Sequence, residues 1–140
     1  DLPANFQKID DAVSAHLAET VYKVGSFTRD LSLESGNLSI TGLGFKPKAI
    51  ILFAADSSSA HKMSIGFSDG TNNMMLADYG NGNPGVWYAY GPRAFWILVD
   101  GSSYVTGTIS FDSDGFTLAL TKTGSPTGTV TVGYLAMSHY

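Results

Sequence analysis

The spacing of apolar residues changes once along this chain, near residue 20, and that change limits the folds open to it. In the first segment the apolar side chains recur at spacings of four, three, four and four residues, at Leu2, Phe6, Ile9, Val13 and Leu17. This spacing lines them along one side of an α-helix. From Val21 onward, short runs of alternating apolar and polar residues are separated by turn residues, which is typical of β-strands. The sequence therefore predicts an N-terminal helix over residues 1–20 and a β domain over residues 21–140.

The centre of the predicted β domain lies within residues 42–56. Here Ile50–Phe53 form a continuous apolar run that is too short for a buried helix. Gly44 and Pro47 precede this run, and a serine-rich segment follows it. We therefore predict a strand that is covered on both faces.

Shorter alternating runs predict further strands on both sides of this centre. They fall within residues 22–26, 31–33, 38–40, 63–67, 74–79, 86–90, 95–99, 104–111, 116–120 and 130–137. The clearest hairpin turns at Asp112-Ser113-Asp114-Gly115, whereas Gly91-Pro92-Arg93 marks either a break in one strand or a connection between two. Roughly eight to ten short strands with regular turns indicate a mainly β fold, an antiparallel β-sandwich.

The predicted helix needs a partner, because a helix of about four turns is marginally stable alone. One possibility is that its apolar stripe packs on the chain's own β domain. The other is a parallel seam between copies of the chain, since a spacing of four, three, four and three residues places a set of side chains close to the a and d positions of heptads. This set is Leu2, Phe6, Ile9, Val13 and His16. These residues do not distinguish a trimeric coiled coil from a dimeric one.

Composition excludes several classes of partner. The formal net charge is −4 and the eight Lys and Arg residues are scattered, so nothing would neutralise a phosphate backbone or an anionic lipid surface. No apolar run approaches the roughly 18 residues that span a bilayer, and no signal peptide precedes the helix. We therefore expect no nucleic acid partner and no membrane insertion. Cysteine is absent, which excludes disulfides and thiolate metal sites.

A search for catalytic residues finds no convincing set. The three histidines lack metal-binding spacing, and the serines of 57–59 lack the strand-to-helix elbow of a hydrolase nucleophile. Asp112–Gly115 begins like a calcium loop but lacks the later ligands, so a turn explains it better. We expect no enzyme activity, no metal and no cofactor. The least favoured alternative is a glycan-degrading pair formed by Asp78 with Asp100 or Asp56.

Aromatic and polar residues gather in one part of the sequence, which indicates a recognition surface. Rigid aromatic rings offer stacking area at low entropic cost, and amide and guanidinium groups add directional hydrogen bonds, as saccharide-binding or protein-binding patches require. About half of these aromatic side chains should be buried, since one face of each strand must lie inside. The candidate ligand-binding residues are Tyr79, Asn81, Asn83, Trp87, Tyr88, Tyr90 and Arg93.

Two blocks of sequence resemble bacteriophage tail proteins. The segment NFQKIDDAVSAHLAE from Asn5 is similar to a junction that precedes the distal part of tail proteins, particularly in phages of Gram-positive hosts. The segments YKVGSFT from Tyr22, ITGLGFKPKAII from Ile40 and SIGFSDG from Ser64 are similar to C-terminal domains of phage fibre or adhesin proteins. The β head also resembles the H-type lectin fold, whose trimers bind sugars, although no sugar-binding motif of that fold is matched.

This resemblance implies a virion appendage in which the helix ends a trimeric stalk and the β-sandwich is the host-binding head. The expected function is a non-enzymatic, homotrimeric tail-fibre tip that binds a host cell-surface glycan and contacts other virion proteins. The alternative is a structural virion module, such as a fibre, collar or head-decoration domain, that trimerises and binds no host ligand. In that case Trp87, Tyr88 and Tyr90 should lie between subunits.

Overall fold

The computed structural model describes residues 3–18, 22–56, 62–79 and 86–139. These residues form one helix, α1 (Ala4–Ala18), followed by ten strands. The strands are β1 (Tyr22–Asp30), β2 (Gly36–Ile40), β3 (Ala49–Asp56), β4 (Lys62–Ser68), β5 (Asn73–Tyr79), β6 (Val86–Tyr90), β7 (Phe95–Asp100), β8 (Ser103–Asp112), β9 (Gly115–Thr123) and β10 (Thr129–Met137). The prediction of a mainly β chain with an N-terminal helix is confirmed.

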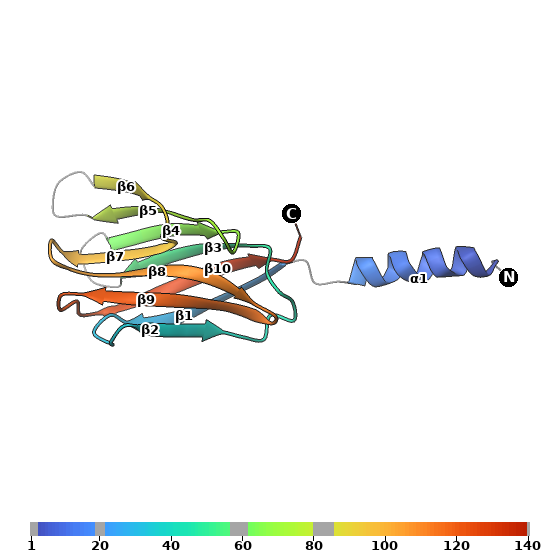
Figure 1. The fold of residues 1–140 in the computed structure, drawn as a ribbon, viewed down its shortest axis with the longest axis horizontal. Coiled ribbons are helices and arrows are strands. Elements are labelled where there is room, and N and C mark those ends of the chain that lie inside the picture. The colour runs from blue at the N-terminus through green and yellow to red at the C-terminus, as the bar shows by residue number, and fades with distance from the viewer. Residues whose placement is uncertain (1–2, 19–21, 57–61, 80–85, 140) are drawn as a thin grey trace.

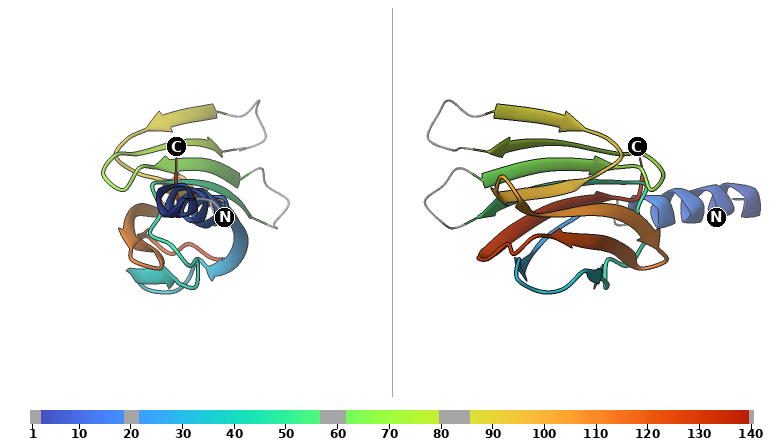
Figure 2. Two further views of the ribbon diagram at one scale, coloured as in Figure 1. Left: turned by 90° about the vertical axis from the view of Figure 1, so that its right-hand side faces the viewer. Right: turned by 60° about the vertical axis from the view of Figure 1, so that its left-hand side comes forward.

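The strands form two antiparallel sheets that pack face to face (Figures 1 and 2). The large sheet has six strands in the order β1-β10-β3-β4-β5-β6, and the small sheet has four in the order β2-β9-β8-β7. Both sheets contain non-consecutive neighbours, so the chain crosses between the layers several times. The predicted antiparallel sandwich is therefore the observed architecture.

The core fills the space between the two sheets. The large sheet contributes Ile50 and Leu52 of β3, and the small sheet contributes Phe95 and Phe116, all of them almost fully buried. The ring of Phe116 meets Tyr134 of β10 edge-on, with centroids 5.2 Å apart, a favourable aromatic geometry. The inward-facing apolar residues of both layers thus hold the sandwich together.

One strand of the large sheet approaches the small sheet unusually closely. Beyond Lys62, whose side chain pairs with Asp56, the inner face of β4 carries only small residues, Ser64, Gly66 and Ser68, and all three are buried. A Cβ atom added to Gly66 would collide with the carbonyl group of Ala94, just before β7. The absence of a side chain at Gly66 is therefore a requirement of the sheet-to-sheet spacing.

Helix α1 projects from the end of the sandwich at which the C-terminus lies (Figure 1). Gln7 Nε2 donates a hydrogen bond to Asp11 Oδ1 at 2.9 Å, one turn further along the helix, and the N–H groups of Phe6 and Gln7 both bond the carbonyl of Pro3. All of the described side chains from Pro3 to Leu17 are exposed. The structure does not support the alternative in which the apolar stripe packs on the chain's own β domain.

The prediction that the Ile50–Phe53 strand is covered on both faces is wrong. Ile50 and Leu52 are buried, but Phe53 is 51% exposed on the outer face of the large sheet. The physical reason is the two-layer architecture: the small sheet covers only one face of β3, and no described segment of the chain covers the other.

Two smaller predictions about strands also need correction. Residues 31–33 form a turn, because Asp30 Oδ1 accepts hydrogen bonds from both the N–H and the hydroxyl of Ser32 and ends β1 there. The first strand, predicted within residues 22–26, continues through Arg29 to Asp30. The segment Gly91-Pro92-Arg93 connects two strands rather than breaking one, and it carries the chain from the large sheet to the small one.

Candidate functional site

The candidate ligand-binding residues follow one edge of the large sheet. Tyr79 ends β5, and Trp87, Tyr88 and Tyr90 belong to β6, the edge strand. The backbone register pairs Tyr79 with Val86. Asn81 and Asn83 lie outside the described residues. The aromatic positions identified from the sequence are therefore neighbours along the β5–β6 edge.

Arg93 lies apart from the start of this edge. Strand β6 runs from Val86, beside Tyr79, to Tyr90, beside Met75. The strand pairings put Tyr90 at the end of the sheet nearer to α1, and Arg93 follows it there. Five residues of extended chain span roughly 15 Å. A ligand at the connection between β5 and β6 would therefore be separated from Arg93 by the length of the strand.

The connection between β5 and β6 and the stalk helix lie at opposite ends of the sandwich. Strand β10 fixes the direction: Met137 pairs with Tyr22, which follows the helix segment, whereas Val130 pairs with Asp56 at the far end of β3. Lys62, Tyr79 and Val86 belong to that same far end. The sequence predicted the aromatic cluster, but only the sheet register shows that part of it lies at the tip remote from α1.

The three carboxylates considered for glycan cleavage lie on different surfaces. Asp56 is almost fully buried on the inner face of the large sheet, with a carboxylate oxygen 3.7 Å from Lys62 Nζ. Asp78 lies on the outer face of that sheet, and its Oδ1 atom is buried without a hydrogen-bond partner among the described residues. Asp100 belongs to the small sheet and accepts hydrogen bonds from the N–H and hydroxyl of Ser102 at 2.8 and 2.9 Å. The structure therefore does not bring any two of them onto one face.

The acidic turn between β8 and β9 is occupied by the protein itself. Asp114 accepts hydrogen bonds from the backbone N–H groups of Gly42 and Gly44 at 2.9 and 2.7 Å, one to each carboxylate oxygen. Asp112 accepts a hydrogen bond from the Thr117 hydroxyl at 2.7 Å. The bonds of Asp114 clamp the turn to the segment before β3, and the bond of Asp112 lies within the hairpin. Within the described residues, no group of three His, Cys, Asp or Glu side chains is placed to hold a metal ion.

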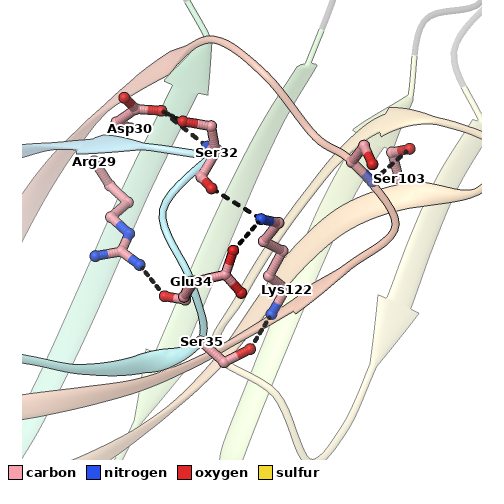
Figure 3. Close-up of polar contacts among 8 residues, drawn as sticks. Arg29, Asp30, Ser32, Glu34, Ser35, Ser103 and Lys122 are labelled. Carbon is pink, nitrogen blue, oxygen red and sulfur yellow. Dashed lines mark hydrogen bonds and ion pairs between the residues drawn. The ribbon is translucent and has the colours of Figure 1, made fainter.

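A polar network fixes the turn between β1 and β2 over the small sheet (Figure 3). Lys122 Nζ donates to the Ser32 carbonyl at 2.9 Å and to Glu34 Oε1 at 2.8 Å. The backbone N–H of Lys122 donates to Ser35 Oγ. Arg29 donates to the Glu34 carbonyl at 2.8 Å. These bonds tie the turn between β1 and β2 to β9, so the network has a structural role.

These turn carboxylates predict how stability depends on pH. Hydrogen bonds from Ser32 lower the pKa of Asp30, and those from Ser102 lower the pKa of Asp100, both from an ordinary value of 3.8. Hydrogen bonding to Lys122 lowers the pKa of Glu34 from 4.5. A lowered pKa stabilises the folded state above the unfolded-state value, and that contribution is lost as the pH falls. We expect the thermal midpoint to fall as the pH is lowered through 4.5 and then 3.8.

Glu34→Gln is the control for this pH dependence, because Glu34 has the highest ordinary pKa of the group. The variant should start its decline at a lower pH than the wild type, as followed by circular dichroism on heating. A decline that begins above about pH 6, well away from any carboxylate value, would contradict the assignment.

The predicted oligomerisation residues form an exposed apolar stripe on α1. Phe6, Ile9, Val13 and Leu17 are between 51% and 78% exposed, while Leu2 lies outside the described residues. A shallow, almost wholly apolar surface runs along this stripe and includes Ala12. In the single chain these side chains are open to solvent.

Comparisons with known proteins leave the family open. No protein-family model and no curated protein matches the chain. Among solved structures it is similar to a tailspike protein of an Acinetobacter baumannii bacteriophage, described as a capsular polysaccharide depolymerase, with 11% identity and a TM-score of 0.33. The match covers 84% of this chain and 18% of the tailspike protein, so the chain spans less than a fifth of that protein's length. A likeness at this level does not assign a family or an activity.

Proposed function

We propose that the chain is the distal head of a bacteriophage tail fibre, a homotrimer in the virion that binds a glycan on the host cell surface and has no enzyme activity. The observation that carries the proposal is that the two ends of the molecule differ. A helix with an exposed apolar stripe leaves one end of the sandwich, and the aromatic β5–β6 edge reaches the other end. A stalk that joins copies and a tip that meets a ligand require this arrangement.

The composition of the two ends supports this division of roles. The stripe on α1 offers apolar side chains at heptad-like spacing, which suits a short parallel coiled coil. The β5–β6 edge combines Tyr79 and Trp87 with nearby asparagines in the sequence. Aromatic rings and amides are the groups with which proteins stack on sugars and bond their hydroxyls.

The alternative is a structural virion module that trimerises without a host ligand. The observation that favours it is the register of β6, which places Trp87 beside Asp78 at the border of an exposed apolar sheet face. An aromatic residue at such a border suits a contact between subunits as well as a contact with a ligand. Binding experiments separate the two functions.

The binding test uses the fluorescently labelled full chain on a panel of Gram-positive cell walls and their isolated polysaccharides. We expect saturable binding to one polysaccharide class, and a loss of at least tenfold in affinity in Asn83→Ala and in Trp87→Ala. Asn37→Ala, on the outer face of the small sheet, is the matched control and should bind as the wild type does. The bound polysaccharide should release no new reducing ends.

Three results would contradict the proposal in different ways. An oligomer that binds no cell wall or polysaccharide would favour the structural module. Equal binding by the wild type and both variants would move the ligand away from the β5–β6 edge. Release of reducing ends would make the protein an enzyme.

A further inference from the structure

The outer face of the large sheet is apolar across most of its width. The alternation along each strand and the pairing between strands bring its outward-facing residues into one continuous surface. Seven of its large apolar side chains are between 37% and 67% exposed: Tyr22, Val24, Phe53, Met63, Phe67, Met74 and Leu76. Half-buried side chains of Ile51, Ile65, Leu135 and Met137 fill the space between them. We call these eleven residues the outer apolar face.

The outer face of the small sheet is different in kind. Across β2, β9 and most of β8 its outward positions are small and polar, and they include Ser39, Thr108, Ser110, Thr117 and Thr121. Its large outward residues, Trp96, Leu98 and Tyr104, are half-buried and gather where β7 pairs with β8. Both faces belong to one sandwich and have the same geometry. Over β2 and β9 the chain uses hydroxyl side chains where the small sheet meets water, and no large apolar side chain there is exposed, so the outer apolar face calls for another explanation.

Strand β4 makes this contrast sharpest. Its large apolar residues, Met63, Ile65 and Phe67, point outward, and its small residues point into the core. A strand in a sandwich with one solvated face normally has the reverse arrangement. Since the inner face must stay small beside β7, the outer side chains of β4 gain burial only if another surface covers them.

We propose that the outer apolar face turns toward the axis of the trimer and packs there against the same face of both neighbouring copies of this chain. Taking about 200 Å² for a fully exposed side chain of this size, the seven exposed residues present roughly 700 Å², close to the ~800 Å² that each partner buries in a stable interface. The face carries no Lys or Arg, and Asp78 is the acidic residue at its border. An uncharged apolar surface is complementary to itself, which suits contacts between identical subunits.

The helix brings this face to a neighbouring copy. Strand β1 follows the helix segment, and its first outward residues, Tyr22 and Val24, belong to the outer apolar face. Copies joined through the stripe on α1 would hold their large sheets side by side. The inference therefore rests on the self-association in the proposed function but uses a different surface, so each can fail alone.

Single cysteines in this cysteine-free chain test the inference directly. Phe53→Cys places a thiol on the central strand β3 of the face, and Ala119→Cys places one at an exposed position on the outer face of the small sheet. Because facing sheets pack about 10 Å apart, too far for a direct disulfide, the reagent is a short bismaleimide. Val13→Cys reports on the helix seam in the same assay.

We expect dilute Phe53→Cys chains to cross-link efficiently to one another and Ala119→Cys chains to remain single. Phe53→Lys combined with Leu76→Lys should raise the concentration for half-dissociation by at least ~100-fold, since like charges would face one another. Because both side chains are exposed in the single chain, circular dichroism should still show the wild-type fold.

Cross-linking at Val13→Cys without cross-linking at Phe53→Cys would overturn this inference and leave the stalk intact. Cross-linking at Phe53→Cys alone would support the sheet contact and remove the stalk from the proposed function. Equal yields at Phe53→Cys and Ala119→Cys would indicate random collision and overturn the inference.

Discussion

Gly66→Ala is expected to lower the free energy of unfolding by about 3 kcal/mol or more, a large part of the total stability of a domain of this size. The new methyl group would meet the backbone carbonyl of Ala94, which cannot rotate away as a flexible side chain could. To make room, the two sheets would have to separate around Phe95 and Ile50, which are almost completely buried. The loss therefore includes packing in the centre of the core.

Gly36→Ala is the matched control for this substitution. A Cβ atom added to Gly36 has no neighbour within 4 Å, and the residue lies at the exposed start of β2. We expect its stability to change by less than about 1 kcal/mol. Urea unfolding followed by tryptophan fluorescence measures both variants. Equal stabilities for Gly66→Ala and Gly36→Ala would show that the close approach of β4 to the small sheet is not needed for folding.

Periodicity in the sequence predicts the strands of this fold well. The hairpin at Asp112–Gly115, the strand at 74–79 and the last strand to Met137 all lie where alternation and turn residues indicated. Such signals are local, since a turn depends on a few residues and a strand on its own alternating pattern. These local predictions hold because the tertiary contacts favour the same strands and turns.

What periodicity cannot supply is which face of a strand points inward. Met63, Ile65 and Phe67 alternate as a core face would, but they lie outside, because the close approach of β7 admits only small residues inside. The same limitation explains the wrong prediction for Phe53, because no described part of the chain covers the outer face of β3 there. In both strands the apolar pattern predicted a burial that the single chain does not provide.

The candidate site was also predicted only in part, because a local sequence pattern does not show how strands run or cross between sheets. Residues close in the sequence share an edge, so Tyr79 and Trp87 were found together. The separation of Arg93 from them depends on the direction of β6 and on the crossing to the small sheet, which are long-range features. Asp56 and Asp78 likewise lie on opposite faces of one sheet because of their positions in separate strands.

The second large effect is expected in the helix: Ile9→Asp combined with Val13→Asp should raise the dissociation constant of the oligomer by at least ~100-fold. Each copy would bring two carboxylates into an apolar seam, where burial of unpaired charge is strongly unfavourable. In the single chain both side chains are more than half exposed. The thermal midpoint of the separated sandwich should therefore match that of the wild type at the same low concentration.

Ser14→Asp combined with Ala15→Asp is the matched control, because it adds the same charge to the same helix away from Phe6, Ile9, Val13 and Leu17. Light scattering over a range of concentrations measures the mass of both variants beside the wild type. If the stripe joins copies of the chain, only the Ile9 and Val13 variant loses mass on dilution. An unchanged mass in that variant would show that the seam is not needed to hold the copies together, and a monomeric wild type would remove the stalk altogether. The exposed stripe would then need a different partner, since a helix of 15 residues is marginally stable without one.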